Sequence, residues 1–421
     1  MARTLRALAA GGLAVALAGC WYQPGQGPNR AAHNAFETQI GVGNVDELTE
    51  QWSADTDGLN VEDPVVSNAG VHAVDSAESW YGLRPATGER MWTHHVENPG
   101  IPLALGPAIS DGGRVLVSSG IGNLGGHYSS SWLDAATGVN LGAGDGSGLV
   151  DSLRGTRSAW RHVGFGSGTP VATSLNLHDS ADPSFGWSRP IHISSGGGAA
   201  PPVTLGNSAV YQAGNGTIGQ GSSTPTFGNG VRAWPLTEPA GCVPSAPTFA
   251  CPTWSLPLSG TSTTVPVLNA DETVLYTVNN AGTVFAVSTN GFQQWSATLG
   301  SPSTGAPALA DGVLYVPTAA GLFAVDAEGC GGASCPPLWR GADTGVTGGA
   351  TQQPAVANGV VYAAWGDGSL RAFDAEGCGG AICGSLWSDG VGSSITGAPA
   401  VSNGQVYVGT QDGRVVAYGL D

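Results

Sequence analysis

A repeated segment near the C-terminus constrains the fold of this chain more than any other feature. Its three clearest copies read APALADGVLY at 306–315, QPAVANGVVY at 353–362 and APAVSNGQVY at 398–407. In each copy a proline opens a short apolar run, and Asn-Gly or Asp-Gly then forms a tight hairpin turn. A β-branched and aromatic strand follows, and a second glycine turn leads into a third strand. The repeat therefore predicts a series of antiparallel β units.

A fourth strand containing a tryptophan completes each unit. These tryptophans are Trp92, Trp254, Trp295, Trp339 and Trp387. Four antiparallel strands in about 45 residues are typical of one blade of a β-propeller. One blade cannot bury both of its faces alone, whereas blades stacked radially in a closed ring bury both and leave only short edges.

The spacing of the units sets the number of blades. The units start at Pro64, Pro107, Pro202, Pro266, Pro307, Pro354 and Pro399. The step from Pro107 to Pro202 is two units long, which predicts a degenerate blade near residues 154–190 and eight blades in all. If that stretch is only an insertion, the ring has seven. The last unit lacks a tryptophan strand, whereas residues 49–53 (TEQWS) have that pattern before the first unit. We therefore expect this N-terminal strand to complete the last blade of an all-β domain over residues 45–421.

Composition excludes other classes of protein. Glycine accounts for 68 of 421 residues, and charged residues for only 11%, against an average of about 25%. Exposed helices need charged residues on their polar faces, so an all-α fold is excluded. The net charge is −17, and every base is arginine. Such a surface repels phosphate backbones, so no nucleic-acid partner is expected.

The N-terminus has the proportions of an export signal. Two arginines and a short apolar run fill residues 1–19, which is shorter than the span of about 20 apolar residues that crosses a membrane. Leu17-Ala18-Gly19-Cys20 resembles the lipobox of bacterial lipoproteins. That resemblance implies cleavage before Cys20, diacylglycerol and palmitate on this residue, and anchoring to the outer face of a bacterial membrane. The alternative is an ordinary secretory signal with an incidental cysteine. Residues 20–44 are predicted to form a flexible tether.

The other six cysteines fall into close pairs, Cys242/Cys251, Cys330/Cys335 and Cys378/Cys383. All three pairs occupy the loop between the third and fourth strands of a unit. Local disulfides, Cys242–Cys251, Cys330–Cys335 and Cys378–Cys383, are expected in an oxidising compartment. A metal site is the weaker alternative, because the spacing is not CxxC and no histidine lies close by.

Two stretches resemble the repeat of the pyrroloquinoline-quinone-like propellers: YVGTQDGRVVAY at 407–418 and RPATGERMW at 84–92. In that family the motif Ala-x-Asp-x-x-Thr-Gly-x-x-x-Trp docks each tryptophan on the next blade. Ala86, Thr87, Gly88 and Trp92 match its end. The resemblance spans residues 45–421 and is weakest in 142–260. It implies that six tryptophans pack between blades: Trp52, Trp92, Trp254, Trp295, Trp339 and Trp387.

The family has two branches with different functions. Quinoprotein dehydrogenases hold pyrroloquinoline quinone and Ca²⁺ in the central funnel. Non-enzymatic lipoproteins, such as the propeller subunit of the outer-membrane β-barrel assembly machine, are scaffolds that bind a partner protein. A Ca²⁺ site needs converging carboxylates, for which the candidates by type are Asp63, Asp111, Asp271 and Asp311. The last three lie in turns, which aspartate stabilises in any case.

No other sequence motif predicts catalysis. The chain has no adjacent cysteine pair of the dehydrogenase kind, no lysine for a phosphate-binding loop, and neither an HExxH nor a GxSxG motif. We therefore assign no catalytic residue, metal ligand or cofactor from the sequence.

One basic stretch departs from the repeat. Arg154, Arg157, Trp160 and Arg161 lie together in an otherwise acidic chain. Arginine and tryptophan often dominate binding at protein interfaces, so these residues are candidates for contact with a partner. The alternative is a basic edge that pairs with neighbouring acids.

The sequence as a whole predicts a monomeric, lipid-anchored scaffold of the cell envelope with an unidentified protein partner. The alternatives are a quinone- and Ca²⁺-dependent oxidoreductase, or a protein that binds a carbohydrate or other small ligand in the funnel.

Overall fold

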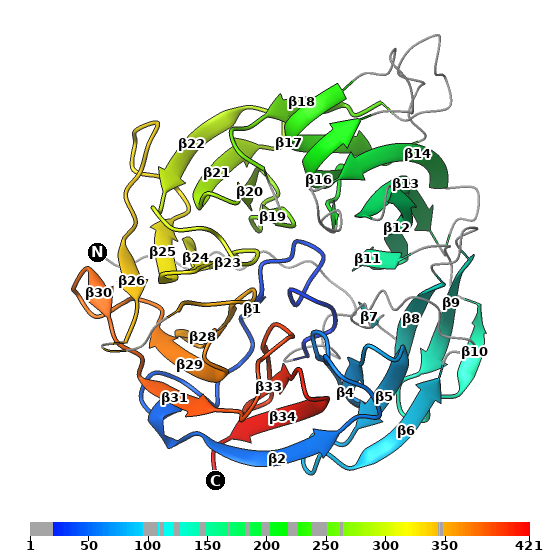
Figure 1. The fold of residues 1–421 in the computed structure, drawn as a ribbon, viewed down its shortest axis with the longest axis vertical. Coiled ribbons are helices and arrows are strands. Elements are labelled where there is room, and N and C mark those ends of the chain that lie inside the picture. Colours follow the sequence, from blue (N-terminus) through cyan, green and yellow to red (C-terminus); the bar gives the residue numbers. More distant parts are fainter. Residues whose placement is uncertain are drawn as a thin grey trace.

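The computed structural model describes residues 20–95, 108–109, 113–121, 127–143, 149–166, 169–179, 181, 186–194, 203–217, 226–237, 251–261, 264–343, 345 and 348–421. In these residues the strands form eight four-stranded blades around a ring (Figure 1), which confirms the predicted eight-bladed propeller. The degenerate blade is present, at residues 149–194. The described helical structure is one 3-10 turn, η2 (Val45–Glu47), and no described helix could cross a bilayer.

The first four blades are built from consecutive strands, innermost strand first. Blade 1 contains β3 (Val65–Ser67), β4 (Gly70–Val74), β5 (Ser79–Leu83) and β6 (Arg90–His95). Blade 2 contains β7 (Ala108–Ile109), β8 (Arg114–Ile121), β9 (His127–Asp134) and β10 (Asn140–Ala143). Blade 3 contains β11 (Leu149–Arg154), β12 (Arg157–Gly166), β13 (Thr169–Asp179) and β14 (Gly186–Ser194). Blade 4 contains β15 (Thr204–Leu205), β16 (Ala209–Thr217), β17 (Thr226–Pro235) and β18 (Trp254–Pro257).

The second four blades repeat this plan, and the last one borrows a strand. Blade 5 contains β19 (Val267–Leu268), β20 (Val274–Val278), β21 (Thr283–Ser288) and β22 (Gln293–Thr298). Blade 6 contains β23 (Ala308–Ala310), β24 (Val313–Thr318), β25 (Gly321–Asp326) and β26 (Trp339–Gly341). Blade 7 contains β27 (Ala355–Ala357), β28 (Val360–Ala364), β29 (Ser369–Asp374) and β31 (Trp387–Gly390). Blade 8 contains β32 (Ala400–Ser402), β33 (Gln405–Gly409), β34 (Arg414–Gly419) and β2 (Thr49–Asp55).

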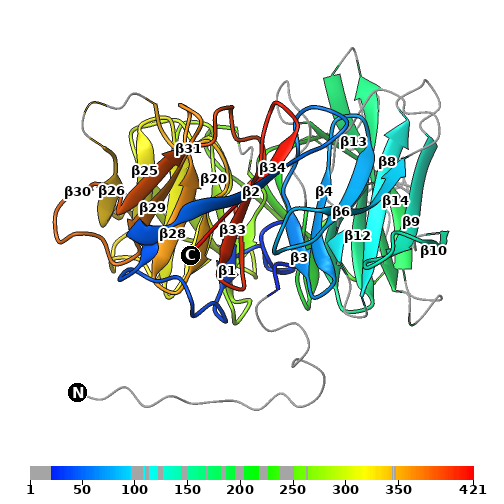
Figure 2. The ribbon, with the colours of Figure 1, turned by 90° about the horizontal axis from the view of Figure 1, so that it is seen from below.

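Strand β2 closes the ring, as predicted. It pairs antiparallel with β34, from Thr49 opposite Gly419 to Asp55 opposite Arg414. The N-terminal strand therefore supplies the outer strand of the last blade, and the two ends of the repeat array meet in one sheet (Figure 2).

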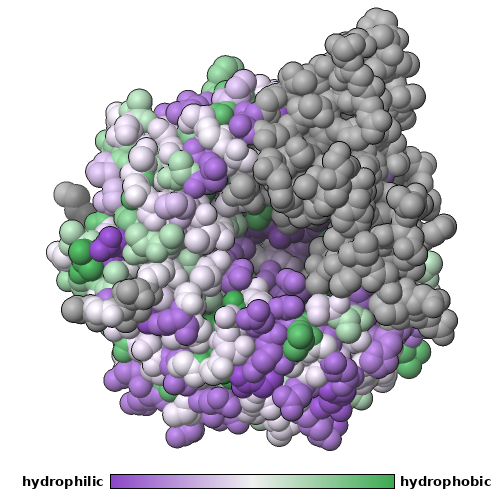
Figure 3. Space-filling view, viewed as in Figure 1, coloured by the Kyte–Doolittle hydropathy of each residue, from purple (hydrophilic) through white to green (hydrophobic). Residues whose placement is uncertain are grey.

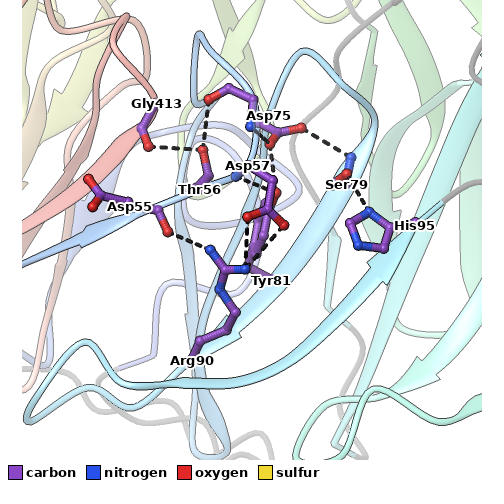
Figure 4. Close-up of polar contacts among 10 residues, drawn as sticks. Asp55, Thr56, Asp57, Asp75, Ser79, Tyr81, Arg90, His95 and Gly413 are labelled. Atoms are coloured by element: carbon purple, nitrogen blue, oxygen red, sulfur yellow. Dashed lines mark hydrogen bonds and ion pairs between the residues drawn. The ribbon is translucent and has the colours of Figure 1, made fainter.

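A polar network secures the chain where it leaves β2 for blade 1 (Figure 4). The Tyr81 hydroxyl accepts a hydrogen bond from the Asp57 backbone N–H (2.9 Å). Arg90 forms an ion pair with Asp57 (Nη1–Oδ1 3.0 Å), and its guanidinium carbon lies 4.9 Å from the centre of the Tyr81 ring. The Thr56 hydroxyl donates to the Gly413 carbonyl in blade 8 (2.9 Å). These contacts join β2, blade 1 and blade 8 at the closure.

The predicted tryptophans contact the neighbouring blade. The indole N–H groups donate to backbone carbonyls there: Trp52 to Pro85 (2.7 Å), Trp92 to Ala135 (3.0 Å), Trp254 to Thr289 (2.9 Å) and Trp387 to Leu48 (3.0 Å). Each ring covers apolar surface of the next blade while its polar N–H is satisfied, which is the arrangement that buried tryptophan requires.

Glycine provides the space for these rings. A Cβ placed on Gly88 would lie 2.5 Å from the Trp52 ring, and one on Gly329 would lie 2.6 Å from the Trp295 ring. Gly377 faces Trp339 in the same way, also at 2.6 Å. All three glycines have positive φ, between 68° and 82°, which other residues rarely adopt. The turn thus needs glycine both for its backbone and for the contact.

We predict that Gly329→Ala destabilises the ring more than Gly331→Ala. Both positions have similar positive φ (82° and 78°), but a Cβ on Gly331 meets nothing within 4 Å. The backbone strain is therefore common to both variants, and the overlap with Trp295 adds about 1–3 kcal/mol for Gly329→Ala alone. Denaturant midpoints of the oxidised proteins measure the difference. Equal losses would contradict the seating of the tryptophan on glycine.

The disulfide loops reach across to the preceding blade. Cys330–Cys335 and Cys378–Cys383 are formed, as predicted, each with Cα atoms 5.5 Å apart. In the second loop, β30 (Ile382–Cys383) pairs in parallel with β26 of blade 6. The first loop reaches blade 5, where the Ser296 N–H donates to the Ala333 carbonyl (3.0 Å). These loops cover the exposed edge of an outer strand, which is otherwise open to pairing with other chains. Cys242 lies outside the described residues.

Removing the second disulfide should loosen blade 6 rather than blade 7 alone. In Cys378→Ser/Cys383→Ser we expect faster hydrogen exchange at the Arg340 and Ala342 amides, which donate to carbonyls of that loop (both 3.0 Å). The loss in unfolding free energy should be about 2 kcal/mol for so short a loop. The Ser296 amide, held by the other loop, is the internal control. Unchanged exchange rates at Arg340 and Ala342 would show that the loop pairs with β26 without its disulfide.

Candidate binding site in the central channel

The segment 21–34 lies in the middle of the ring (Figure 1). Its backbone carbonyls accept hydrogen bonds from inner strands of four blades: Trp21 from Val66 (2.7 Å), Asn29 from Leu268 (2.9 Å), Ala31 from Leu309 (2.7 Å) and Ala32 from Val356 (2.8 Å). A short strand, β1 (His33–Asn34), also pairs in parallel with β27. We call residues 21–34 the channel segment.

Side chains extend these contacts to two further blades. The Gln23 amide donates to the Leu153 carbonyl (3.1 Å) and accepts from the Leu153 N–H (3.0 Å). The Asn34 amide donates to the Val401 carbonyl (2.8 Å). The expectation of a flexible tether over residues 20–44 is therefore wrong for this segment. The segment has no apolar periodicity because it binds through its backbone and its side-chain amide groups. These groups form hydrogen bonds with the backbone of the inner strands, which have no other neighbouring strand on the channel side.

A cation and two carboxyl groups meet beside the channel segment. The Arg30 guanidinium donates to the Asp151 carbonyl and interacts electrostatically with Asp63. The Asp63 carboxylate accepts a hydrogen bond from the Ala398 N–H (2.7 Å). Burial raises the pKa of Asp63, and the Ala398 N–H and Arg30 oppose that shift. Burial, and then the neighbouring Asp63, raise the pKa of Glu62 to about 8.

These residues do not fit a quinone with Ca²⁺. The channel segment takes up the centre of the ring, and a guanidinium already lies beside Asp63. Among the described residues, no three of the His, Cys, Asp and Glu side chains gather as metal ligands would. The predicted carboxylates do not converge either: Asp271 and Asp311 line a separate cavity that Asp63 does not reach, and Asp111 lies outside the described residues.

That cavity, of about 470 Å³, lies between the channel segment and blades 5 and 6. Its lining includes Asn29, His33, Asp271, Tyr276, Asp311 and Glu328. Burial lowers the pKa of His33, against the pull of Asp311. The lining thus holds carboxylates and amides beside the apolar Leu268 and Leu309, a chemistry that suits a polyhydroxyl or cationic ligand. Figure 3 shows a hollow near the centre of one face of the ring, and the coloured residues at its rim are largely hydrophilic.

Residues of the basic stretch form contacts within the ring. Arg154 forms an ion pair with Glu272 (2.6 Å) and donates to the Leu205 carbonyl (2.9 Å), so it joins blades 3, 4 and 5. Arg157 pairs with Asp179 (3.2 Å), and Trp160 is 0% exposed. Trp160 is therefore closed to a partner, and the ion pairs of Arg154 and Arg157 are those expected of a basic edge that pairs with neighbouring acids. Partner binding by the two arginines stays a prediction. Acids outnumber bases by 31 to 14, so an arginine readily finds a carboxylate within the fold. The side chain of Arg161 lies outside the described residues.

Sequence reasoning missed the channel segment and Glu62. The available signal was local: tight turns at Pro24-Gly25 and Gly27-Pro28 indicate a compact path rather than an extended tether. The backbone has positive φ at Gly25 (71°), Arg30 (57°) and Ala32 (52°), as such a path requires. The adjacent Asp63 is a local signal for a raised pKa of Glu62, but burial, the larger cause, leaves no signal in the local sequence.

Comparisons with known proteins agree with the fold. A sequence model of the family described as outer membrane protein assembly factor BamB matches residues 228–329 and 280–418. No curated protein sequence matches the chain. The ring is similar to quinohemoprotein alcohol dehydrogenase from Comamonas testosteroni, with a TM-score of 0.69, 15% identity, and coverage of 96% of this chain and 81% of that one.

Two further structures show the same architecture. A europium-containing methanol dehydrogenase has a TM-score of 0.67 and 13% identity, with coverage of 96% of this chain and 98% of that one. BamB from Moraxella catarrhalis has a TM-score of 0.56 and 14% identity, with coverage of 88% of this chain and 99% of that one. The predicted resemblance to quinone-type propellers of the BamB kind is confirmed. At these identities the structures establish the fold alone.

We predict that the Glu62 carboxyl makes the stability of the fold depend on pH. Its pKa in the folded protein, about 8, exceeds its ordinary value of 4.5, so between these values the folded state binds the extra proton. Stability should therefore fall as the pH rises from 5 to 8, with a slope of at most about 1.4 kcal/mol per pH unit from this group. We expect Glu62→Gln to flatten the profile, measured by denaturant unfolding. Glu47→Gln, at an exposed site, is the control, and an unchanged profile in Glu62→Gln would contradict the assignment.

Proposed function

We propose that this chain, a propeller similar to the outer membrane assembly factor BamB, is a lipid-anchored scaffold of the cell envelope. It binds other envelope proteins as a monomer, catalyses no reaction of its own and holds no quinone. The observation that carries the proposal is the channel segment. In the quinoprotein branch the funnel is the place of the cofactor, whereas here the chain's own backbone binds the inner strands.

The match to the BamB family supports the scaffold branch. It covers residues 228–418, the part of the chain with the clearest repeats. The two dehydrogenases are more similar to the ring in fold than BamB is, with TM-scores of 0.69 and 0.67 against 0.56, but fold alone does not choose between the branches. The acidic net charge of −17 supports protein rather than nucleic-acid partners.

The anchor is proposed at Cys20. The residue ends a lipobox-like sequence, and it is the free cysteine among the described residues. Its thiol lies 3.3 Å from the Asn68 amide oxygen. A diacylglyceryl group on this sulfur would hold the ring to the outer face of a membrane, and a second acyl signal would make the attachment stable.

Thermal unfolding of a soluble Cys20→Ser protein, residues 20–421, tests the choice between scaffold and dehydrogenase. We expect the Tm to stay unchanged when pyrroloquinoline quinone and Ca²⁺ are added, while a quinoprotein dehydrogenase shifts in the same assay. A ligand at about 100 times its Kd would add about 2.7 kcal/mol, a rise of several degrees. Such a rise together with dye-linked alcohol oxidation would overturn the proposal.

The same substitution in the full-length chain, with residues 1–19 present, tests the anchor in cells. The wild-type chain should take up a palmitate analogue and sediment with membranes, and Cys20→Ser should do neither. If the wild-type protein is exported but carries no palmitate analogue and stays in the soluble fraction, the N-terminus is an ordinary secretory signal.

The cavity between blades 5 and 6 favours one further candidate, binding of a small polar ligand. A saturable Tm shift with a sugar or a diamine that disappears in Asp271→Asn would support it, since Asp271 lines that cavity.

A further inference from the structure

The proposed lipid site is joined to the ring without a tether. The residue after Cys20 is already bound, because the Trp21 carbonyl accepts a hydrogen bond from Val66 in β3 (2.7 Å). Two residues later, Gln23 binds Leu153 in blade 3. A lipid on Cys20 would therefore sit directly against the ring, and the ring could not turn freely above the membrane.

Cys20 lies at one particular end of the inner strands. Its neighbour Asn68 is in the turn between β3 and β4, the first and second strands of blade 1. The equivalent turns of blades 7 and 8 bind the loop that follows the channel segment: Asn358 donates to the Ile40 carbonyl (2.9 Å), and the Gly404 N–H donates to the Glu37 carboxylate (2.9 Å). We call this end the anchor face; it comprises Cys20, residues 36–44 and the turns at 68–69, 358–359 and 403–404.

Two apolar side chains are exposed on the anchor face, Phe36 (63% exposed) and Val42 (41%). The loop that carries them is held firmly. The Phe36 N–H donates to Asn34 Oδ1 (3.0 Å), and the buried Glu37 carboxylate accepts from the N–H groups of Thr38 (2.9 Å) and Gln39 (2.7 Å). Isolated exposed apolar residues are common on proteins. These two are distinguished by lying on the face to which the lipid would be attached.

The opposite end of the ring is marked by Leu59, which is 58% exposed. The neighbouring Asn60 N–H donates to the Gln411 carbonyl (3.0 Å), in the turn that follows β33. Gly404 lies in the turn before β33. Strand β33 thus runs between the two, and Leu59 and Phe36 lie at opposite ends of it.

We propose that the anchor face rests on the bilayer that holds the Cys20 lipid, with Phe36 and Val42 in the headgroup region. The proposal rests on the lipid anchor at Cys20. Aromatic and aliphatic side chains enter the interface readily, whereas an acidic protein gains nothing from anionic headgroups. The contact therefore depends on the anchor and these side chains, and zwitterionic lipid is the natural surface. The end that carries Leu59 faces away and is left open to protein partners.

Full-length lipidated protein in phosphatidylcholine vesicles tests the proposal. Phe36→Cys and Leu59→Cys, labelled with a nitrobenzoxadiazole dye, have similar exposure and differ in the face that carries the dye. The lipid occupies Cys20 and the sequence pairs the other cysteines, so the introduced thiol takes the dye. Both labelled proteins should first match the wild-type Tm.

We expect the dye at position 36 to brighten at least about twofold in vesicles and to be quenched by lipids carrying a nitroxide in the headgroup region, and the dye at position 59 to do neither. Mass spectrometry and flotation establish the anchor separately. If the protein is lipidated and floats with the vesicles but the fluorescence of the dye at position 36 does not change, the proposed orientation alone is wrong. Protein that carries no lipid would overturn the anchor and, with it, the orientation.

Discussion

The ring depends on one repeated contact, a tryptophan of one blade seated on a glycine turn of the next. Trp52, Trp92, Trp295 and Trp339 are at most 8% exposed, and each faces a glycine with positive φ. Loss of a buried tryptophan costs about 3–5 kcal/mol, against a total of about 5–15 kcal/mol for a typical domain. Because each interface also aligns the blade that forms the following interface, a closed ring needs the same contact at most of its joints.

Blade 2 has a different solution. The outer strand of blade 2, β10, contains no tryptophan, and its Leu141 is exposed. In this half of the ring, blades 1 to 4, polar contacts reach across several blades: Arg154 joins β11 to Leu205 and Glu272, and Gln23 binds Leu153 through two hydrogen bonds. The channel segment reaches this half through Gln23 and Arg30, which bind blade 3, while its backbone bonds go to blades 1, 5, 6 and 7. It therefore has a structural role that a tether would not have.

The sequence alone predicts the structural features that are local and repeated. Asp311-Gly312, Asn358-Gly359 and Asn403-Gly404 predict hairpins, and the first residue of each has φ near 50°, as such a turn requires. The closure through Trp52 was predictable because the last blade visibly lacks a strand.

Contacts between distant segments without an apolar pattern were not predictable from the sequence. Arg154 finds Glu272 only once blades 3 to 5 are in place. The channel segment binds mainly through backbone carbonyls, which every sequence has, so its residue types carry little trace of the partners. The same holds for β30, whose parallel pairing with β26 depends on the neighbouring blade. The pKa of Glu62 is raised mainly by burial, which arises only when distant segments come together, whereas the second cause, Asp63, is the next residue in the chain.

The channel segment would also connect the proposed anchor with the blades of the ring. It bonds to blades 1, 3, 5, 6, 7 and 8, and it directly follows the cysteine that carries the proposed lipid. A load applied at the anchor would therefore be shared among many hydrogen bonds in several sheets, instead of pulling on one strand end. The buried Arg30 strengthens this arrangement, because a guanidinium removed from water is stable only beside acceptors such as the Asp151 carbonyl and Asp63. Under the proposed anchoring, a ring whose centre is filled by this segment would not use the funnel as a cofactor site and would keep a fixed orientation, which a scaffold needs to present its loops to partners.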